Sequence, residues 1–458
     1  MADLSRRRFL GAVGAAPAAG ACGFTGRTGP NIVLIITDQQ HIDTISALGC
    51  RHLRTPAMDE LARRGTSFQN SYCADPVCSP SRSAIFTGRM PSEADVASNG
   101  RPIYRGIPNL GQWFREQSRY ETFYAGKWHL PRSYSREIPG FQVLPGGIGG
   151  QGNIGDACVS QACVDFLQKR RSRRPFFLVA SLLQPHDVCE WLRLNLRDPG
   201  ALPYPELGGE LPELPPNFDY EPFEPRHLQR LRQGNEPAHG QWSELHWRYY
   251  MWSYYRHVEM VDGEIGRILE ALDAAGRRTD TVVLLTSDHG EGLARHQMVR
   301  KSSSYEESVK VPFLISWPGE LPEGRHEKER LVSGLDIAPT LCDCAGIPAP
   351  PKQRGWSLRA SLAGKRAHPR EMVVVEIPPD AGRLVRTPRY KYVTYAGDTL
   401  DQLFDMEEDP GETRNLAAQA GMAAVVGEHR RLLREWEQRL EPAPNQPWAD
   451  AWWRRSSA

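Results

Sequence analysis

Long apolar, β-branched runs that end abruptly in polar residues constrain the fold of this chain more than any other feature. Such runs are typical of strands buried on both faces of a parallel sheet. Helices are expected at 55–68, capped near Thr55, and at 254–276, where apolar residues recur every three or four positions up to Gly276. Strands that alternate with helices predict an α/β fold with a mostly parallel central sheet flanked by helices. The runs are PNIVLIITDQQ (30–40), RPFFLVASLLQPHD (174–187), TDTVVLLTSDHG (279–290) and VPFLISWPG (311–319).

Side chains able to bind a metal ion or an anion stand at the ends of three of these strands. Asp38 ends the first strand, His186 the second, and Asp288 with His289 the third. In open α/β sheets the ligand site lies beyond the carboxyl ends of the strands, so these residues are predicted to converge. The alternative interpretation is that polar residues stand there only because loops begin where strands end.

The C-terminal part of the chain has a different pattern. Short alternating segments at 371–377, 383–396 and 400–406 predict an antiparallel sheet, and residues 423–440 predict a terminal helix. We therefore expect a catalytic domain at 30–350 and a smaller α+β subdomain at 351–458. Residues 191–240 are rich in proline and glutamate and predict a long surface excursion.

The first 29 residues have the layout of an export signal: a basic start, a weakly apolar middle and small residues before Cys22. The segment SRRRFL resembles a twin-arginine motif with Arg6 and Arg7 as the pair, which implies the twin-arginine translocase as a partner. The expected location is periplasmic or secreted, with lipid anchoring through Cys22 left open. The alternative is a merely basic terminus. No other stretch is long and apolar enough to span a membrane.

Charge and cysteine usage exclude several classes of protein. The net charge is +1, so no broad field favours nucleic acid or an anionic membrane surface. The nine cysteines include no C-x-x-C pair, which argues against a zinc ribbon or a thioredoxin-like site. Cys342 and Cys344 are expected in a helix near the core rather than at a metal. Disulfide connectivity stays open.

The segment CSPSRSAIFTGR (78–89) places a cysteine, a proline, a serine and an arginine within five positions. It fits the pattern C-x-P-S-R-x-x-x-x-T-G, and by it the chain resembles the type I sulfatases of the alkaline-phosphatase-like superfamily. Further similar segments follow in family order between residues 30 and 420. They are PNIVLIITDQ, GKWHL, TSDHGE, KSSSYEESVKVP, LDIAPTL and LFDMEEDPGETRNLA.

The resemblance implies that Cys78 is converted to formylglycine by a formylglycine-generating enzyme. The hydrated aldehyde would be the nucleophile and Arg82 would hold it, while Pro80 fits the start of a helix that favours an anion. One divalent metal ion is also implied, with Ca²⁺ first and Mg²⁺ or Mn²⁺ as alternatives. Its implied ligands are Asp38, Gln39, residue 78, Asp288 and His289.

Two of these metal ligands depart from the commonest family pattern. Many sulfatases have Asp-Asp where this chain has Asp38-Gln39, and Asn where it has His289. This variant resembles choline sulfatases, phosphonate monoester hydrolases and some polysaccharide sulfatases. The imidazole adds a nitrogen ligand, which puts a strict preference for Ca²⁺ in doubt.

The resemblance also implies an anion pocket formed by Lys127, His129, His186 and Lys301. Asn99 is implied as a further substrate contact. Lys301 or His186 would protonate the leaving alcohol, and His129 would assist release of sulfate. Taken singly, each lysine or histidine has an alternative interpretation without a functional role, as a surface lysine or as a hydrogen-bonded histidine. His296 receives no role.

The implied activity is hydrolysis of an organic sulfate ester, foremost of a carbohydrate, by a sulfuric ester hydrolase. Two alternatives stay open: a phosphonate or phosphate monoester hydrolase on the same scaffold, and an inactive binding protein. The sequence does not name the substrate. Four tryptophans, Trp191, Trp242, Trp247 and Trp252, either stack on a sugar ring or belong to the core.

Overall fold

The computed structural model describes residues 29–145, 151–195, 209–221, 223–234, 242–363, 370–379 and 381–443. The predicted export signal, with Arg6, Arg7 and Cys22, lies outside the described residues. None of the described helices is both long enough and apolar enough to cross a bilayer. The eight described cysteines are free thiols.

A sheet of eight strands forms the centre of the molecule, in the order β4-β3-β5-β1-β6-β7-β2-β8. Its neighbours pair in parallel except around β7, which runs antiparallel to both β6 and β2. The mostly parallel sheet is therefore confirmed, and the run at 311–319 supplies its one reversed strand. The strands are β1 (Asn31–Asp38), β2 (Thr66–Tyr72), β3 (Glu121–Gly126), β4 (Gln142–Val143), β5 (Phe176–Pro185), β6 (Thr281–Ser287), β7 (Phe313–Ser316) and β8 (Arg325–Ser333).

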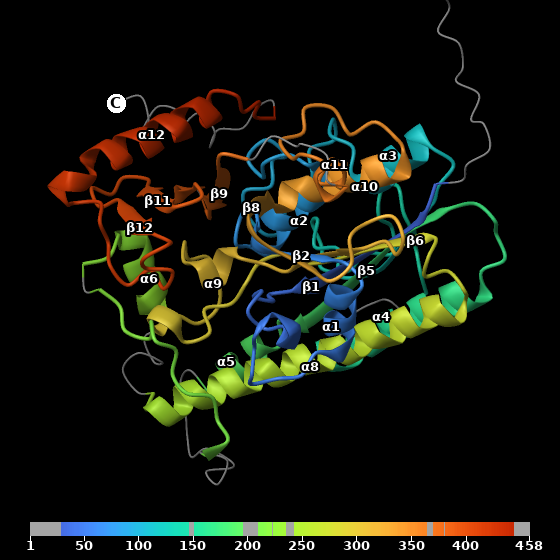
Figure 1. Ribbon diagram of the computed structural model, residues 1–458, viewed down its shortest axis with the longest axis horizontal. Coiled ribbons are helices and arrows are strands. Elements are labelled where there is room, and N and C mark those ends of the chain that lie inside the picture. The colour runs from blue at the N-terminus through green and yellow to red at the C-terminus, as the bar shows by residue number, and fades with distance from the viewer. Residues whose placement is uncertain are drawn as a thin grey trace, which may run out of the picture.

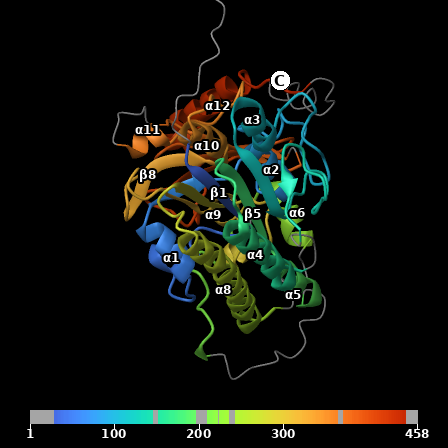
Figure 2. The ribbon, with the colours of Figure 1, turned by 90° about the vertical axis from the view of Figure 1, so that its right-hand side faces the viewer.

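Helices cover both faces of this sheet, so it forms the middle of three layers (Figures 1 and 2). One face carries α1 (Pro56–Arg63), α4 (Gly152–Lys169), α5 (Val188–Asn195) and α8 (Glu244–Ala274). The other carries α2 (Cys78–Thr87), α3 (Leu110–Gln117), α10 (Ile337–Ala345) and α11 (Arg359–Leu362). The expected helix positions of Cys342 and Cys344 are confirmed, since both are buried in α10.

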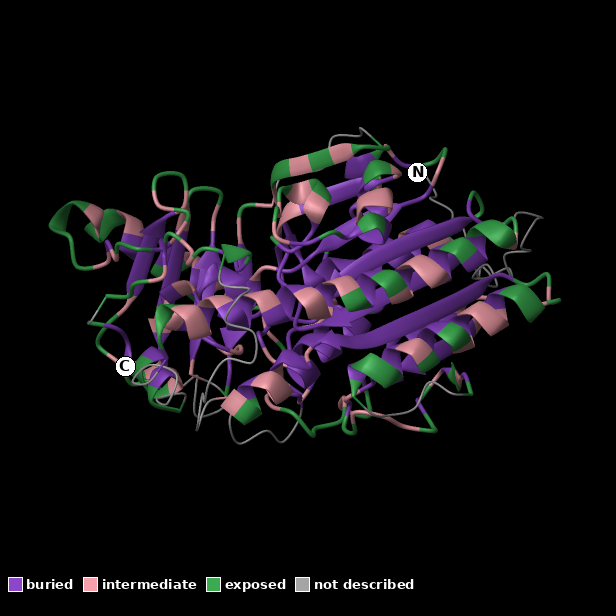
Figure 3. Ribbon diagram, turned by 90° about the horizontal axis from the view of Figure 1, so that it is seen from below, coloured by how far each residue is buried: buried purple, intermediate pink, exposed green. Residues whose placement is uncertain are grey.

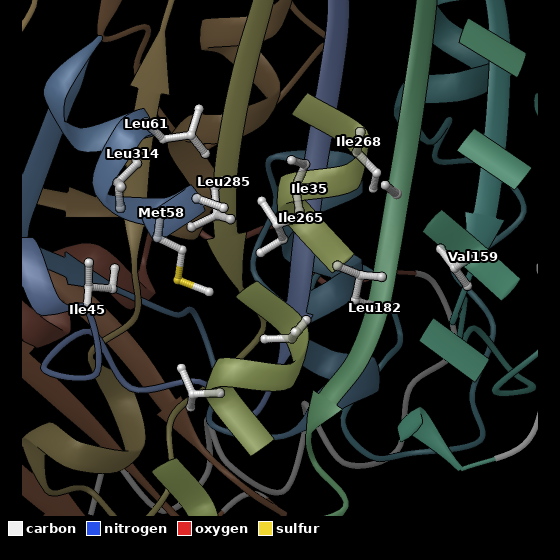
Figure 4. Close-up of a cluster of buried hydrophobic side chains, with 14 of the residues drawn as sticks. Ile35, Ile45, Met58, Leu61, Val159, Leu182, Ile265, Ile268, Leu285 and Leu314 are labelled. Atoms are coloured by element: carbon white, nitrogen blue, oxygen red, sulfur yellow. The ribbon is translucent and has the colours of Figure 1, made fainter. Parts of the chain in front are cut away.

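The side chains of β1 alternate between the two cores, as the period of a strand requires. Val33 and Ile35 point into the cluster under α8, whereas Ile32, Leu34 and Ile36 point into the cluster under α2. Figure 4 shows Ile265 and Ile268 of α8 packed over Ile35 and Leu285 of the sheet. Burying a side chain of this size contributes about 1.5–3 kcal/mol. These contacts fix the strands that carry the site.

Helix α8 begins ten residues before the predicted start and ends at Ala274, two residues before the predicted end. It starts after Ser243, and Gly276, with a φ of +64°, follows its end. Trp247 and Tyr250 lie in the core cluster, so the extra turns are held by aromatic burial. The core interpretation is confirmed for Trp242 and Trp247, which are both buried. Figure 3 shows the exposed outer stripe of the long helices above the buried strands.

The C-terminal part forms a separate antiparallel sheet in the order β12-β11-β10-β9, as predicted. Its strands are β9 (Val373–Ile377), β10 (Gly382–Arg386), β11 (Tyr390–Tyr395) and β12 (Gln402–Asp405). The terminal helix α12 (Ala423–Glu437) packs against β10. The short helices α6 (Arg226–Gly234) and α9 (Glu306–Val309) lie beside this sheet (Figure 1). The division at residue 350 stays a prediction.

Candidate active site

The central strands bring the predicted residues to one edge of the sheet. In the parallel pair β1–β6, Thr37 lies opposite Ser287, so Asp38 and Asp288 leave the sheet at the same level. Ligand atoms of Asp38, Cys78, Asp288 and His289 all lie within 4.8 Å of one another, and all four residues are buried. Three of the four strand-end residues predicted to converge, Asp38, Asp288 and His289, thus lie together with Cys78, although they are up to 251 positions apart in the chain.

Cys78 is the first residue of α2, after Val77 in extended conformation. Its sulfur lies 3.3 Å from Lys301 Nζ, 3.7 Å from Lys127 Nζ and 3.3 Å from His289 Nε2. The free N–H groups at a helix start and two ammonium groups together favour a negative charge. The surroundings of residue 78 therefore suit an anionic nucleophile or an anionic substrate group.

This electrostatic setting shifts the pKa values of the two central acids. Burial and the Asp38 carboxylate act to raise the pKa of the Cys78 thiol, but Lys127 and Lys301 hold it well below its usual value. Burial likewise acts to raise the pKa of Asp38, and Lys127, with Nζ 2.6 Å from Asp38 Oδ2, helps to hold it well below its usual range. Asp38 is therefore an anion at neutral pH, and the surroundings of Cys78 favour its thiolate form.

Arg82 is fully buried and pairs with the carboxylates of both Asp38 and Asp288. Its NH2 lies 2.9 Å from Asp38 Oδ2 and its Nε 2.9 Å from Asp288 Oδ2. NH1 donates to the Lys127 carbonyl and to Ser181 Oγ, both at 2.8 Å. With Cys78 unmodified, the described contacts of Arg82 do not include residue 78, and its expected contact with a hydrated aldehyde there stays a prediction. The guanidinium fixes the two carboxylates that face residue 78, because its fork spans both.

His289 is oriented so that one ring nitrogen faces the cluster. Its Nδ1 lies 2.9 Å from the Gly290 carbonyl, which fixes the proton on that atom. In the neutral imidazole Nε2 then carries the lone pair, and it points toward Cys78 and Asp288. Burial lowers the pKa of His289, but Asp288 and Cys78 raise it above its usual value. Two carboxylates and one oriented imidazole form a donor set that fits a divalent cation. Burial and the nearby Asp38 raise the pKa of Asp288, which indicates an excess of negative charge. A bound cation would relieve that excess.

Gln39 is held at this edge by a residue that the sequence did not single out. Its Oε1 accepts from Lys301 Nζ at 2.8 Å, and its Nε2 donates to Glu291 Oε2. Buried Glu291 also accepts from the Tyr250 hydroxyl and from the Arg300 backbone N–H. The signal was present, because Glu291 closes the segment TSDHGE. Glu291 orients the Gln39 amide so that its oxygen faces the site.

His129 and Asn99 lie beside the start of α2, and His186 lies near enough to Asp38 and Cys78 to interact with their charges. Ser79 Oγ donates to the His129 carbonyl at 2.5 Å, and Ser79 N donates to Asn99 Oδ1 at 2.9 Å. Among the described contacts no hydrogen bond joins the His129 ring to Cys78, and His129 Nδ1 is buried without a hydrogen-bond partner. Burial, followed by the nearby Lys301 and Lys127, lowers the pKa of His186 to about 3, against the opposing pull of Asp38.

Comparison with known proteins places this geometry in a family. The family model described as Sulfatase matches residues 30–347, and the one described as N-sulphoglucosamine sulphohydrolase, C-terminal, matches residues 294–439. A Delta 4,5-hexuronate-2-O-sulfatase of Bacteroides thetaiotaomicron is 33% identical over 436 residues, covering 89% of this chain and 88% of that protein.

Solved structures agree with the sequence comparison. A 2-O GAG sulfatase superposes with a TM-score of 0.80 at 31% identity, covering 90% of this chain and 92% of that one. The phosphonate monoester hydrolase of Agrobacterium radiobacter superposes with a TM-score of 0.71 at 24% identity, covering 90% and 96%, which shows a shared fold.

Proposed function

Because the chain belongs to the sulfatase family, we propose that it hydrolyses a carbohydrate sulfate ester in which the sulfate is on O2 of a 4,5-unsaturated hexuronate. The reaction class follows from the family and from the site. The position of the sulfate rests on the 33% identity to a Delta 4,5-hexuronate-2-O-sulfatase and on the 31% identity to a 2-O GAG sulfatase structure. The observation that carries the proposal is residue 78 set between Lys127, Lys301 and His289.

The nucleophile belongs to residue 78 in this proposal, after conversion of Cys78 to formylglycine by a formylglycine-generating enzyme. The hydrated aldehyde supplies one hydroxyl for attack on sulfur and a second for release. Asp38, Asp288, His289 and Gln39 would hold one divalent cation, with Ca²⁺ first and Mg²⁺ or Mn²⁺ as alternatives. That ion would supply positive charge beside the nucleophile and the sulfate.

The other catalytic roles in this proposal belong to lysine, histidine and asparagine side chains around residue 78. Lys127 and Lys301 stabilise charge on the sulfate oxygens, since both ammonium groups already converge on residue 78. Lys301 carries a proton that it can give to the leaving alcohol. Before Cys78 is converted, Cys78 and Cys189 raise the pKa of this ammonium group against the effect of burial. His186, with its lowered pKa, is neutral and suits hydrogen bonding to substrate. His129 assists release, and Asn99 contacts the sugar.

The test is a substrate panel with the protein coproduced with a formylglycine-generating enzyme. Unsaturated disaccharides with sulfate on O2 of the uronate or on O6 of the hexosamine, and an aryl phosphonate monoester, are compared at equal concentration. We expect the wild-type protein to release sulfate from the 2-O-sulfated substrate and Cys78→Ala to release none. The melting temperature of Cys78→Ala should equal that of the wild type, which shows that the variant is folded. Preferred turnover of the 6-O-sulfated sugar refutes the position, and preferred turnover of the phosphonate favours the alternative enzyme.

We also propose export through the twin-arginine translocase, on the strength of Arg6 and Arg7 in SRRRFL. That route carries folded proteins, so maturation and metal loading precede it. Replacing both arginines by lysine should leave the precursor in the cytoplasm, as seen by fractionation. Unchanged export of the lysine variant would refute this route.

A further inference from the structure

A second cluster of metal-ligating side chains lies between the catalytic sheet and the C-terminal sheet. It consists of His296, in the short turn Arg295–Gln297, Glu307 in α9, and Glu412 in the loop after β12. All three are buried, and their ligand atoms lie within 4.8 Å of one another. None of the three touches residue 78 or its neighbours in the described contacts. The region is the one where α9 lies beside the strands of the C-terminal sheet (Figure 1).

The spacing and the protonation state of this cluster suit a bound cation. His296 Nε2 lies 3.8 Å from Glu307 Oε1. An ion about 2.0–2.2 Å from each ligand sets ligand atoms roughly 3–4 Å apart. Burial, and then the nearby Arg232 and Lys391, lowers the pKa of His296 to about 3, so the imidazole is neutral. Asn217 Nδ2 lies 3.3 Å from His296 Nε2 and donates to its lone pair. A bound cation would take that lone pair in place of this hydrogen bond.

An unpartnered buried oxygen gives an independent reason to expect a ligand. Glu307 Oε1 is fully buried, has no hydrogen-bond partner among the described residues and lies 3.8 Å from His296 Nε2. Such an oxygen is costly unless it is protonated or bound to a cation. Burial and then the Glu412 carboxylate raise the pKa of Glu307 to about 8. The neighbouring Lys391 is shared with other acids, because its Nζ lies 2.6 Å from Glu412 and 3.1 Å from Glu306. Together with Arg295 it only partly offsets the rise in the pKa of Glu307.

Cavities on two sides of the cluster offer a path for an ion. One of about 490 Å³ is lined by His296, Glu412 and Asn217, and another of about 980 Å³ is lined by Glu307 and Asn217. An entry path is one requirement for a metal site, together with ligand type and spacing.

We propose that His296, Glu307 and Glu412 form a second metal site, which takes a divalent transition-metal ion, with Zn²⁺ as the ion of choice. One imidazole nitrogen and two carboxylates suit zinc better than calcium, which prefers six to eight oxygen ligands. The site is structural: it ties the segment between His289 and Lys301 to the C-terminal subdomain. It is thereby distinct from the group formed by Asp38, Asp288 and His289.

Equilibrium dialysis against Zn²⁺ tests this site in the full chain, with bound zinc measured by mass spectrometry. The protein carries unmodified Cys78, so the result does not depend on turnover. We expect the wild-type protein to hold about one ion more than Glu307→Gln, which has the shape of the protonated carboxyl group and so preserves packing. Glu306→Gln, one residue away and outside the donor group, is the matched control and should keep the ion. Asp288→Asn should lose only the ion of the catalytic group.

Thermal unfolding gives the second readout. Zn²⁺ should raise the melting temperature of Asp288→Asn, in which only the second site remains, and should not raise that of Asp288→Asn combined with Glu307→Gln. If the Glu307 variant does not fold, His296→Gln is measured in its place. Equal zinc content in wild type and Glu307→Gln, or an equal thermal shift in the single and double variants, overturns the proposal.

Discussion

Replacing Arg82 by methionine tests whether the buried guanidinium holds the two carboxylates of the site. The change keeps the length of the side chain and removes its charge and all four hydrogen bonds to Asp38, Asp288, Lys127 and Ser181. Lys127 still pairs with Asp38, so Asp288 bears most of the loss. Removing one partner of a buried ion pair costs about 3–5 kcal/mol. Because Asp288 can take up a proton, its raised pKa keeps the cost within this range.

The distinctive expectation is rescue by metal. A divalent cation between Asp38 and Asp288 replaces the lost positive charge, and removal of the guanidinium should tighten its binding. Each tenfold gain in affinity adds about 1.4 kcal/mol of stability at saturating metal. The assay is urea unfolding of the Cys78 protein with and without Ca²⁺. Without metal the midpoint should fall by at most about 1.5–2.5 M, given an m value of at least about 2 kcal/mol/M for a chain of this size. Added metal should recover part of that loss.

Arg354→Met is the matched control. Arg354 pairs with buried Glu93, with Nε 3.0 Å from Oε1, at the far end of α2. This variant should lose stability too, but Ca²⁺ should stabilise it no more than it stabilises the wild type. If Ca²⁺ stabilises Arg82→Met and Arg354→Met equally, the guanidinium of Arg82 has no special relation to a cation site, and the reasoning fails.

Three further predictions concern the chemistry. Peptide mass analysis of active protein should show a loss of about 18 Da at Cys78, and activity with only free thiol there would exclude formylglycine. Asp288→Asn should weaken metal binding and activity together, with partial recovery at high metal concentration; activity that falls without any change in metal affinity would count against a ligand role. His129→Ala should give a burst of alcohol about equal to the enzyme concentration and then slow turnover, whereas Lys301→Ala should show no burst and a rate lower by about 10²–10⁴. The reverse pattern would exchange the two roles.

The sequence predicted the parts of the site that depend on strand ends and on the local motif around Cys78. Asp38, Asp288 and His289 were predictable because parallel strands deliver their last residues to one edge. The partners of Arg82 and the contact between Gln39 and Glu291 were not, because they depend on side-chain directions across strands distant in sequence. The early start of α8 was missed for a similar reason: the aromatic residues around Trp247 gain their helical state from burial against other elements.

Cys78 is 1% exposed once the chain has folded, and its surroundings come from segments as far away as Lys301. An enzyme that modifies this thiol must therefore reach it before β6 and the segment that follows are in place. Such a modification would compete in time with folding. Some of the contacts that close the site join residues more than 200 positions apart in the chain, as in the pair Cys78–His289. Pairings of such long range form slowly. The same topology that buries residue 78 in the folded chain leaves it accessible until the later strands are in place.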